Sequence, residues 1–496
     1  MSSPVNIIFL NTIQIERDSK TAIYLQLTQQ LINAIQRGFL QAGNKLPGTR
    51  MVAQQLQLNR NTIVAVYAEL EAQGWIEIIP NKGAFVLTHF HNPIIERPYT
   101  SSIAIENYPR QTGYSFSKSI ILDYKSTIYN TDYFFTDGTA DLRLNRFKQL
   151  SNQYSASMNR KSTLRNLSKY TDYGNIFFKE QLSNFLNQTR GLHISTDNLL
   201  INRSAEMNIY LLTRVLITTG DIIVVAELSN ATINMTFLQG GAKIITIPID
   251  EHGIQVDVLR EYLKQHKIRA VYITPHHHYP TTVTLSAIRR IELLQLANTY
   301  GFIIIEDDYD YDFHYDKSAV LPMASADVNG MVIYTGTFGK SLAPSFQTSF
   351  IVAPQNLVQA LYKYLGIVDR QGDIIMEQAL GEMIEEGNMH RHLKKSIQIY
   401  RDRRDYFCQQ LANNFPAEIN YKIPTGGLAT WVTFRKTISL NKIAINTHKQ
   451  NLTIPRNILY QNKNLTALRI GFGHMNQEEI KISMDIFKQA IAEINN

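Results

Sequence analysis

The stretch Met331–Pro344, MVIYTGTFGKSLAP, joins an apolar run of β type to small residues and a single lysine, Lys340. Similar apolar runs recur at 221–227, 243–250, 270–275, 302–308 and 349–354, and helical stretches such as TLSAIRRIELLQLANTYG (284–301) separate several of them. This alternation is typical of an α/β domain with a mainly parallel sheet that helices cover on both faces. Ligands of such sheets bind beyond the carboxyl ends of the strands.

Three residues at such strand ends, Asp307, Tyr309 and Lys340, predict a specific chemistry. An amine can attack the aldehyde of pyridoxal phosphate to form a Schiff base, and a carboxylate beside the pyridine nitrogen keeps the ring protonated. Lys340 and Asp307 suit these two roles, and Tyr309 suits a hydrogen bond to the ring oxygen. Because aspartate and lysine are common at strand ends, an ordinary surface lysine is the alternative interpretation.

Residues 15–90 predict a different fold, a winged helix-turn-helix. Apolar residues recur at helical spacing within 24–35, 52–56 and 63–70, Asn59 suits an N-cap, and Gly38 and Gly74 end two of these helices. The segment WIEIIPNKGAFVLT (75–88) predicts two short strands around a turn. A fold of this kind places its third helix in the major groove of DNA.

The residues predicted to contact DNA lie at the start of the third helix and in the wing. Arg60 can grip guanine with two hydrogen bonds, and Asn61 suits adenine. Lys82, at the wing tip, can reach a phosphate or the minor groove. The full predicted set is Arg50, Arg60, Asn61, Thr62, Lys82 and Gly83. A helical triplet that binds only protein is the alternative.

Charge agrees with a polyanionic partner. The 496 residues carry a net charge of +7 with a pI near 9.1, and no Asp or Glu occurs from Thr21 to Ala68. A glutamine-rich helical segment with a few solvated bases explains the same run. The only cysteine is Cys408, no apolar run is long enough for a membrane span, and the first residues lack a signal-peptide pattern, so we expect a cytoplasmic protein.

The segment 91–132 is predicted to be a linker, since its periodicity fades and prolines alternate with polar residues. His89 and His91 form an HxH pair with no second pair of ligands nearby. His276, His277 and His278 are consecutive, so they cannot point the same way on an extended chain. We therefore predict no metal site.

The sequence KLPGTRMVAQQLQLNRNTIVAVYAELEAQGWIEIIPNKGAFV (45–86) resembles the DNA-binding domain of the GntR superfamily, whose pattern is LPSTR…LA…L.VSR.TV..AY..L...G. Gly48 and Asn59 each stand where the family has serine, and Asn81-Lys82 replace a frequent Gly-Ser. Residues from about Asp137 onward resemble the aminotransferase-like domain of fold-type I pyridoxal-phosphate enzymes. The combination resembles the MocR subfamily of GntR regulators.

This second resemblance is carried by four segments: RGLHISTDNLLI, TPHHHYPTTVTLSAIRRIELLQLA, IIEDDYDYDFHY and VIYTGTFGKSLAP. It implies that Lys340 carries the aldimine, that Asp307 pairs with the pyridine nitrogen, and that Tyr309 contacts the ring oxygen. It also implies that Thr337, Ser204 and Ala205 lie at the phosphate. Arg469 in LRIGFGHM matches an arginine that binds a substrate carboxylate; a structural arginine beside the sheet is the alternative.

Several positions depart from the family pattern. Glu206 brings a negative charge to the helix start that cradles phosphate. Ala231 stands where a tyrosine stacks on the cofactor ring, Gln347 where an arginine pairs with phosphate, and Thr282 where the family has glycine. Each lost contact costs about 1–3 kcal/mol if buried, so cofactor binding is expected to be weak.

The sequence therefore predicts a DNA-binding transcription regulator. Its aminotransferase-like domain, 133–496, binds pyridoxal phosphate on Lys340 and senses a small amine or amino acid, in a regulatory rather than a catalytic role. We expect it to read double-stranded DNA as a homodimer and not to bind membranes. Two alternatives stay open: a regulator whose sensor domain has lost the cofactor, and a functional aminotransferase.

Overall fold

The computed structural model of this chain describes residues 13, 15–17, 19, 21–36, 39–87, 111–116, 130–144, 147–161, 165, 174–315, 320–338, 348–369, 372–435 and 438–495. The chain divides into two compact units, Met1–Phe116 and Ser117–Asn496. Each unit is built around its own hydrophobic core. Among the described helices, none is long and apolar enough to cross a membrane.

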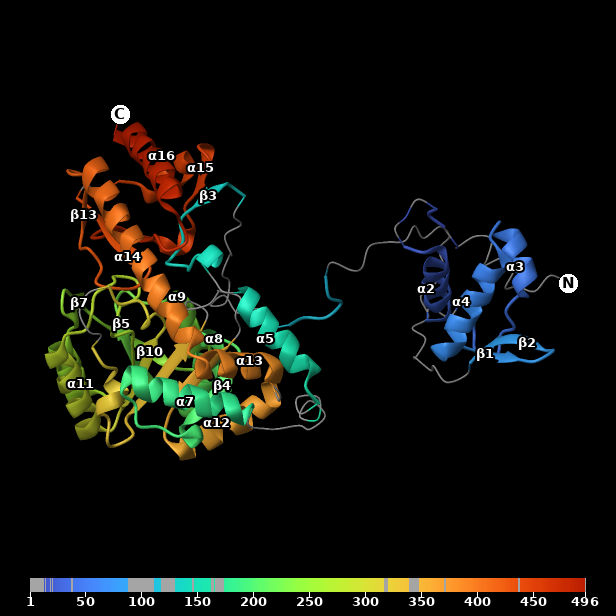
Figure 1. Ribbon diagram of the computed structural model, residues 1–496, viewed down its shortest axis with the longest axis horizontal. Coiled ribbons are helices and arrows are strands. Elements are labelled where there is room, and N and C mark those ends of the chain that lie inside the picture. Colours follow the sequence, from blue (N-terminus) through green and yellow to red (C-terminus); the bar gives the residue numbers. More distant parts are fainter. Residues whose placement is uncertain are drawn as a thin grey trace. The chain divides into compact units, whose positions relative to one another are not determined.

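The first unit is the predicted winged helix-turn-helix (Figure 1). Its elements are α2 (Ile23–Gln36), α3 (Thr49–Gln55), α4 (Arg60–Ala72), β1 (Ile76–Ile79) and β2 (Gly83–Val86), and the two strands pair antiparallel. The core is an apolar stripe from each helix, which includes Leu27, Leu31, Val52, Ile63, Val66 and Leu70. Asn59 caps α4, since its side chain accepts a hydrogen bond from the Asn61 amide at 2.9 Å.

One hydrogen bond and one glycine fix the geometry of this unit. The buried Tyr67 hydroxyl donates to the Pro47 carbonyl at 2.7 Å, which ties α4 to the segment before α3. Gly83, at the start of β2, has a φ of +113°, and a Cβ there would lie 2.9 Å from Lys45 Cε. Only glycine adopts this backbone readily, so Gly83 sets the shape of the wing.

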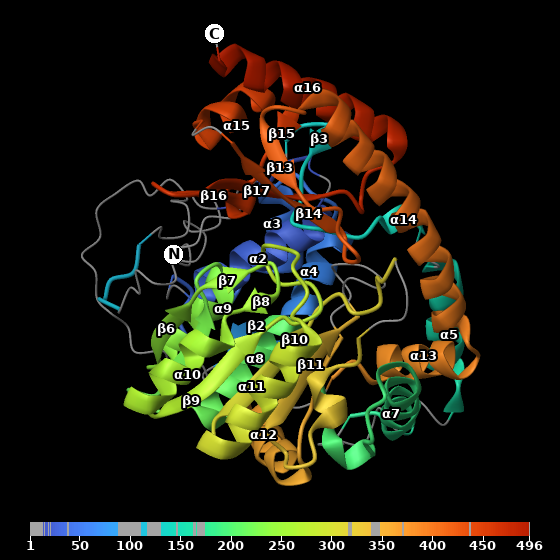
Figure 2. The same ribbon diagram turned by 90° about the vertical axis from the view of Figure 1, so that its left-hand side faces the viewer.

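The second unit contains a seven-stranded sheet in the order β4-β12-β11-β10-β9-β5-β6 (Figure 2). The strands are β4 (Leu199–Asn202), β5 (Ile222–Ala226), β6 (Lys243–Ile247), β9 (Ile268–Ile273), β10 (Ile303–Asp308), β11 (Val332–Thr337) and β12 (Ser349–Val352). Only β12 runs antiparallel to its neighbours, β11 and β4. The predicted, mainly parallel sheet is confirmed, and β4 is the strand that the sequence did not reveal.

Helices cover both faces of this sheet because successive strand residues point to opposite sides. Ile223 and Val225 pack in one cluster with residues of α8 (Ala205–Leu216), α9 (Ala231–Gln239) and α12 (Gln355–Val368). Val224 and Ala226 pack in another with α10 (Val256–Gln265) and α11 (Ala287–Tyr300). A third cluster joins the β4 edge to α5 (Phe147–Asn159), α7 (Ile176–Arg190) and α13 (Ile374–Glu385).

A second lobe of this unit has its own antiparallel sheet, in the order β13-β14-β17-β16. Its elements are β13 (Ile419–Tyr421), β14 (Ala429–Phe434), β16 (Leu459–Gln461), β17 (Thr466–Gly471), α14 (Asn388–Asn414), α15 (Leu440–Lys449) and α16 (Gln477–Asn495). Figures 1 and 2 both show α14 extending from α13 to this lobe. Short pairs β3 (Tyr133–Phe134) with β15 (Leu452–Thr453) and β7 (Ile249–Asp250) with β8 (Gly253–Ile254) complete the strands, and the 3-10 turns are Leu142–Leu144, Thr196–Asn198, Met323–Ala326 and Arg456–Ile458.

Candidate functional site

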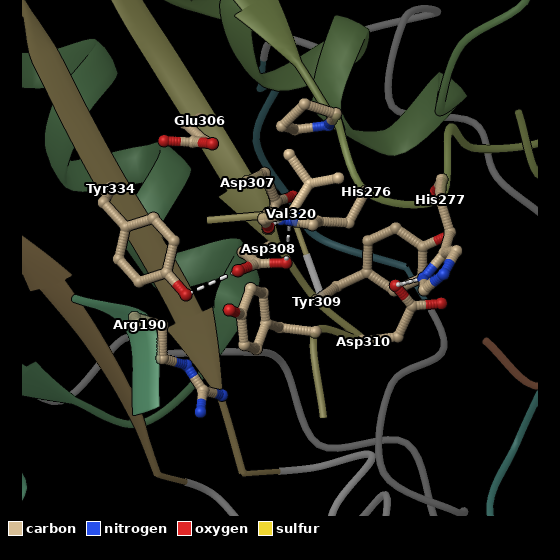
Figure 3. A network of polar contacts seen from close by, with 12 residues as sticks. Arg190, His276, His277, Glu306, Asp307, Asp308, Tyr309, Asp310, Val320 and Tyr334 are labelled. Carbon is tan, nitrogen blue, oxygen red and sulfur yellow. Dashed lines mark hydrogen bonds and ion pairs between the residues drawn. The ribbon is translucent and has the colours of Figure 1, made fainter. Parts of the chain in front are cut away.

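The carboxyl end of β10 separates consecutive acidic residues onto opposite faces of the sheet (Figure 3). Asp307 has the parity of Ile305, whose side chain packs on the α8 and α9 face. Glu306 and Asp308 have the parity of Ile304, which packs on the other face. Glu306 is fully buried, and its carboxylate accepts hydrogen bonds from the amides of Met323 and Ala324.

Asp307 is a buried carboxylate held by two neighbouring strands. The Tyr272 hydroxyl of β9 donates to Asp307 Oδ2 at 2.6 Å, and the Thr335 hydroxyl of β11 donates to Oδ1 at 3.3 Å. Burial raises the pKa of Asp307 to about 6, the two hydrogen bonds act to lower it, and the charges of Asp308 and Glu206 add to the rise. The group therefore titrates close to neutrality and is ionised above pH 6.

On the other face, Asp308 lies against the His276 imidazole and the Tyr334 hydroxyl (Figure 3). Its carboxylate accepts a hydrogen bond from the Tyr334 hydroxyl and lies 3.2 Å from His276 Nδ1. Although burial opposes ionisation, His276, Arg190 and Tyr334 together hold the pKa of Asp308 below its usual value. This aspartate stays ionised while Asp307, the adjacent residue, titrates.

Tyr309 and Arg469 join the two lobes. The Tyr309 hydroxyl donates to the His277 carbonyl at 2.7 Å and accepts from Arg469 Nη2 at 3.2 Å. Arg469 is 1% exposed, and it also donates to the carbonyls of Asp137 and Pro280, each at 2.8 Å. Burial disfavours its charge, but nearby Tyr309, Tyr279 and the acidic groups around it raise the Arg469 pKa overall.

The start of α8 is the predicted phosphate cradle. Ser204 is the N-cap, and its hydroxyl accepts a hydrogen bond from the Met207 amide at 3.1 Å. A helix leaves its first four amides without intrahelical partners, so the cap leaves those of Ala205 and Glu206 for another acceptor. The Glu206 side chain is exposed at this end. Thr337 is half-buried at the end of β11 and donates to the Thr348 carbonyl at 3.4 Å.

Other predicted positions are placed as follows. Ala231 is exposed at the first residue of α9. Thr282 has a φ of +62°, in the left-handed region that glycine favours. Lys340 and Gln347 lie outside the described residues, as do His89 and His91.

The three consecutive histidines each have a partner of their own. His276 Nε2 lies 2.6 Å from the Val320 carbonyl oxygen, His277 Nδ1 lies 2.9 Å from Asp310 Oδ1, and His278 Nδ1 lies 2.9 Å from the Thr281 hydroxyl. Within the described ranges, no group of three His, Cys, Asp or Glu side chains is arranged to hold a metal ion.

A cleft of about 950 Å³ opens between the two lobes next to these residues. Its lining comes from the end of β5, the β7–β8 pair, the turn at Thr281–Thr284, and β13, β14 and the β16–β17 turn. Thr281 in this lining follows Pro280, whose carbonyl accepts a hydrogen bond from the buried Arg469, so one residue separates the lining from the partner of Arg469. Trp431 also lines it and stacks edge-on with Tyr460, with ring centroids 5.0 Å apart.

Sequence reasoning missed Tyr272, Tyr279 and Thr335. Tyr272 and Thr335 bond Asp307, and the Tyr279 ring centroid lies 4.7 Å from the Arg469 guanidinium carbon. Strand alignment was the signal that could have found two of them. Thr335 pairs directly with Asp307 in the parallel register, and Tyr272 pairs with Ile305, one step along the same face.

The DNA-facing candidates lie on the surface of the first unit. Arg60 and Asn61 are exposed in the first turn of α4, and Thr62 beside them is half-buried. Arg50 in α3 and Lys82 in the turn between β1 and β2 are exposed. The structure thus brings Arg60, Asn61 and Thr62 together on one helix start.

Comparison with known proteins matches each unit to a family. The model of bacterial regulatory proteins of the gntR family matches residues 23–86, and the model of aminotransferase class I and II matches residues 139–487. The probable rhizopine catabolism regulatory protein MocR of Rhizobium meliloti is 25% identical over 396 residues, which are 79% of this chain and 78% of the relative.

One further relative matches nearly the whole chain, and one solved structure matches the fold of the second unit. The uncharacterized HTH-type transcriptional regulator YdeL of Bacillus subtilis is 24% identical over 474 residues, which are 94% of this chain and 96% of the relative. A crystal structure of Pyrococcus horikoshii kynurenine aminotransferase matches with a TM-score of 0.69 at 23% identity, over 76% of this chain and 97% of that one. This last likeness shows the fold of the second unit.

Proposed function

This chain belongs to the aminotransferase class I and II family and carries a GntR domain ahead of it, and from that premise we propose a transcription regulator controlled by a small molecule. The first unit binds DNA. The second binds pyridoxal phosphate, the cofactor of this aminotransferase family, and senses a small amine or amino acid. The proposal depends on the combination of two features in one chain. Arg60 is exposed at the start of α4, and Asp307, whose pKa is raised to about 6, is buried at the end of a strand in the seven-stranded sheet.

The DNA contacts follow from exposure and charge. Arg60 and Asn61 are assigned to base edges, with Thr62 beside them. Arg50 and Lys82 are assigned to the phosphate backbone, and Gly83 holds the turn that presents Lys82. No acidic residue occurs from Thr21 to Ala68, so this surface does not repel a phosphate chain.

The described residues fit pyridoxal phosphate unevenly. On the ring-nitrogen side, Asp307 has spare lone pairs and an ionised form available above pH 6. Tyr309 supplies a hydroxyl close by. On the phosphate side, Ala205 and Glu206 supply amides and Ser204 and Thr337 supply hydroxyls, but the Glu206 carboxylate opposes an anion. The described residues fit the group, and at its phosphate they offer amides, hydroxyls and one negative charge.

When bound, the cofactor supplies an aldehyde carbon that accepts a primary amine and a ring that spreads negative charge. Lys340 is assigned as the amine of the protein that holds it. Asp307 keeps a proton at the ring nitrogen, and Tyr272 and Thr335 keep the Asp307 carboxylate in place. Tyr309 is assigned to the ring oxygen. Its single O–H donates to the His277 carbonyl in this structure, so it would have to turn from that carbonyl to donate to the cofactor, while Arg469 donates to the hydroxyl oxygen.

The effector is assigned to the cleft between the lobes. Its volume of about 950 Å³ is ample for a small amine or amino acid. Arg469 is buried behind the lining of this cleft and donates to the carbonyl of Pro280, the residue before Thr281. A ligand there contacts both lobes, so its binding can change how they sit against each other.

Two observations favour a second candidate, a regulator whose sensor unit no longer holds the cofactor. Ala231 offers no stacking ring, and Glu206 places a negative charge where a phosphate is expected. The same positions argue against a functional aminotransferase, because catalysis needs a rigidly held cofactor.

Two copies of the chain are proposed to act together in the cytoplasm. In one copy of the chain, large apolar side chains are exposed to solvent, including Ile367 of α12 (83% exposed) and Ile176 of α7 (65% exposed), and a second copy could cover such residues. A dimer presents two winged units to two half-sites at a fixed spacing. Sedimentation of the full chain tests this, and a monomer at micromolar concentration contradicts it.

The DNA assignment is tested on a duplex selected from a random pool by the full-length protein. Arg60→Ala should cost about 1–3 kcal/mol and relax preference at one base pair. Lys82→Ala should weaken all sequences alike and lower the salt slope by about 1. Binding that is unchanged by Arg60→Ala would contradict the assignment of α4.

The sensor assignment is tested by titrating the full-length protein with pyridoxal phosphate and recording its visible absorption. Repeating the DNA titration with cofactor, and with a panel of amines and amino acids, should show one class that shifts DNA affinity. No spectral change at saturating cofactor supports the candidate without a cofactor.

A further inference from the structure

The exposed face of α4 carries apolar side chains between the polar residues Arg60 and Asn61 at its start and Glu71 near its end. Ile63, Val66, Tyr67 and Leu70 form its buried stripe. On the opposite side Val64 is 45% exposed, and Ala65 and Ala68 are also exposed. A helix that leaves apolar side chains on its solvent face has a surface that another molecule can cover.

Val64 lies on the face that the DNA-reading assignment already uses. It follows Arg60 by four residues and Asn61 by three, and such residues are neighbours on a helix surface. The helix rises about 1.5 Å per residue, so Val64 stands about 6 Å further along its axis than Arg60. A helix that puts Arg60 and Asn61 against base edges therefore brings Val64 to base edges as well.

The charge of this surface fits nucleic acid better than an apolar protein partner. The helices described in this unit carry no acidic residue before Glu69, and Arg60, one turn before Val64, is exposed, as are Arg50 and Lys82 elsewhere on the unit. In the major groove, base edges show hydrogen-bond donors, acceptors and a single apolar group, the C5 methyl of thymine. An apolar, branched side chain at this place matches that group alone.

We propose that Val64 reads the C5 methyl group of a thymine in the operator, and so acts as a specificity-determining residue. The inference rests on the proposed function of α4 as the DNA-reading helix. It adds a chemical requirement to the operator: a thymine close to the base pair that Arg60 contacts, in each half-site.

The test replaces thymine by deoxyuridine, which removes the methyl group and keeps every hydrogen-bonding atom. The full-length protein first selects a duplex from a random pool, and each thymine of that duplex is then replaced singly. At fixed salt, one replacement per half-site should weaken binding about fourfold, the loss expected for one buried methyl group. In Val64→Ala the same replacement should have no further effect.

Met51→Ala is the matched control, because Met51 of α3 is 46% exposed and apolar but lies off α4. This variant should keep the full sensitivity to deoxyuridine. Thermal unfolding checks that Val64→Ala folds, as expected for an exposed position. Equal deoxyuridine sensitivity in the parent and Val64→Ala overturns the inference, and so does a selected duplex without thymine beside the Arg60 contact.

Arg60→Ala distinguishes a wrong assignment of Val64 from a wrong assignment of α4 as the DNA-reading helix. If Arg60→Ala weakens binding but no thymine couples to Val64, the proposed function stands and the thymine contact is wrong. If Arg60→Ala leaves binding unchanged, α4 is not the reading helix, and the assignment of Val64 is wrong with it.

Discussion

The two ends of the proposed cofactor site differ in what their residues do for the protein itself. At the ring-nitrogen end, Asp307 is buried and bonded to a neighbouring strand, and Tyr309 beside it is bonded to the buried Arg469 of the opposite lobe. At the phosphate and stacking end, Glu206 and Ala231 are exposed at helix starts. The first end matches the family pattern, and the second departs from it.

The comparison shows why an intact motif is weak support for cofactor use. Arg469 donates to two backbone carbonyls and to Tyr309, so replacing it would leave buried acceptors unsatisfied even in a protein without cofactor. Ala231 faces no such constraint, because an exposed side chain costs little to change. The residues that match the family pattern, such as Arg469, also hold the fold together. Tests of function must therefore separate their structural role from cofactor binding.

The largest expected effect concerns Lys340. After incubation with pyridoxal phosphate and reduction with borohydride, the parent should carry a covalent label on Lys340, and Lys340→Ala should carry none. Peptide mapping by mass spectrometry measures this. Lys422→Ala is the control, since Lys422 is an exposed lysine in the lining of the cleft and its loss should leave the label in place. A label spread over surface lysines would contradict a dedicated site.

The next effect separates the structural role of Asp307 from its cofactor role through pH. Its folded pKa, about 6, lies above the ordinary value of 3.8, so the protein without cofactor loses stability as pH rises from about 4 to 6. The loss should approach about 3 kcal/mol, and Asp307→Asn should remove it. Denaturant unfolding at several pH values measures this.

Asp250, in the same unit, should change stability with pH in the opposite direction to Asp307. Its hydrogen bond from Arg289 lowers the pKa of Asp250 to about 2, so its contribution is present above pH 4 and lost as pH falls through 2. Asp250→Asn should therefore destabilise mainly above pH 4. If Asp307→Asn gives the same pH profile as Asp250→Asn, Asp307 does not titrate near neutrality.

Sequence reasoning found the parts of the site that are local in the chain. Asp307 and Tyr309 follow one apolar run, and Arg60 follows an N-cap, so their places could be read from neighbouring residues. The Asp307 partners Tyr272 and Thr335 lie 35 and 28 residues away on other strands, so finding them needs the order and register of the strands as well as the apolar runs. The pairing order of strands decides such contacts, and a pattern of apolar runs does not contain it.

The elements that the sequence did not reveal are short. Leu199–Asn202 is four residues and Ile419–Tyr421 is three, and runs of that length fit a strand or a buried helix end equally well. The sheet of the small lobe combines two pairings between strands consecutive along the chain, β13 with β14 and β16 with β17, and one long-range pairing of β14 with β17 joins them.

The third test restores the family residues at the phosphate and stacking end of the proposed cofactor site. Ala231→Tyr returns a stacking face and Gln347→Arg returns a charge for the phosphate, and each should tighten pyridoxal phosphate binding by about 1–3 kcal/mol. Absorption titration measures the affinities. Ala231→Leu and Gln347→Leu are the controls, because they add bulk without an aromatic ring or a charge and should bring no gain. If the restored pair binds no better than the parent, these positions do not limit affinity.

The smallest expected effect is at Thr282, which lines the cleft between the lobes. Its φ of +62° costs a residue with a Cβ about 1–2 kcal/mol, and a β-branched side chain fits that region poorly. The turn nevertheless holds, since the Thr282 amide donates to the His278 carbonyl at 2.7 Å. Thr282→Gly removes the strain, while the greater freedom of glycine in the unfolded chain offsets about 0.5–1 kcal/mol of the gain. The free energy of unfolding should therefore rise by about 1 kcal/mol. Thr282→Ala keeps a Cβ in the same backbone conformation and should gain less, so an equal gain in both variants would place the strain in the threonine side chain and not in its backbone.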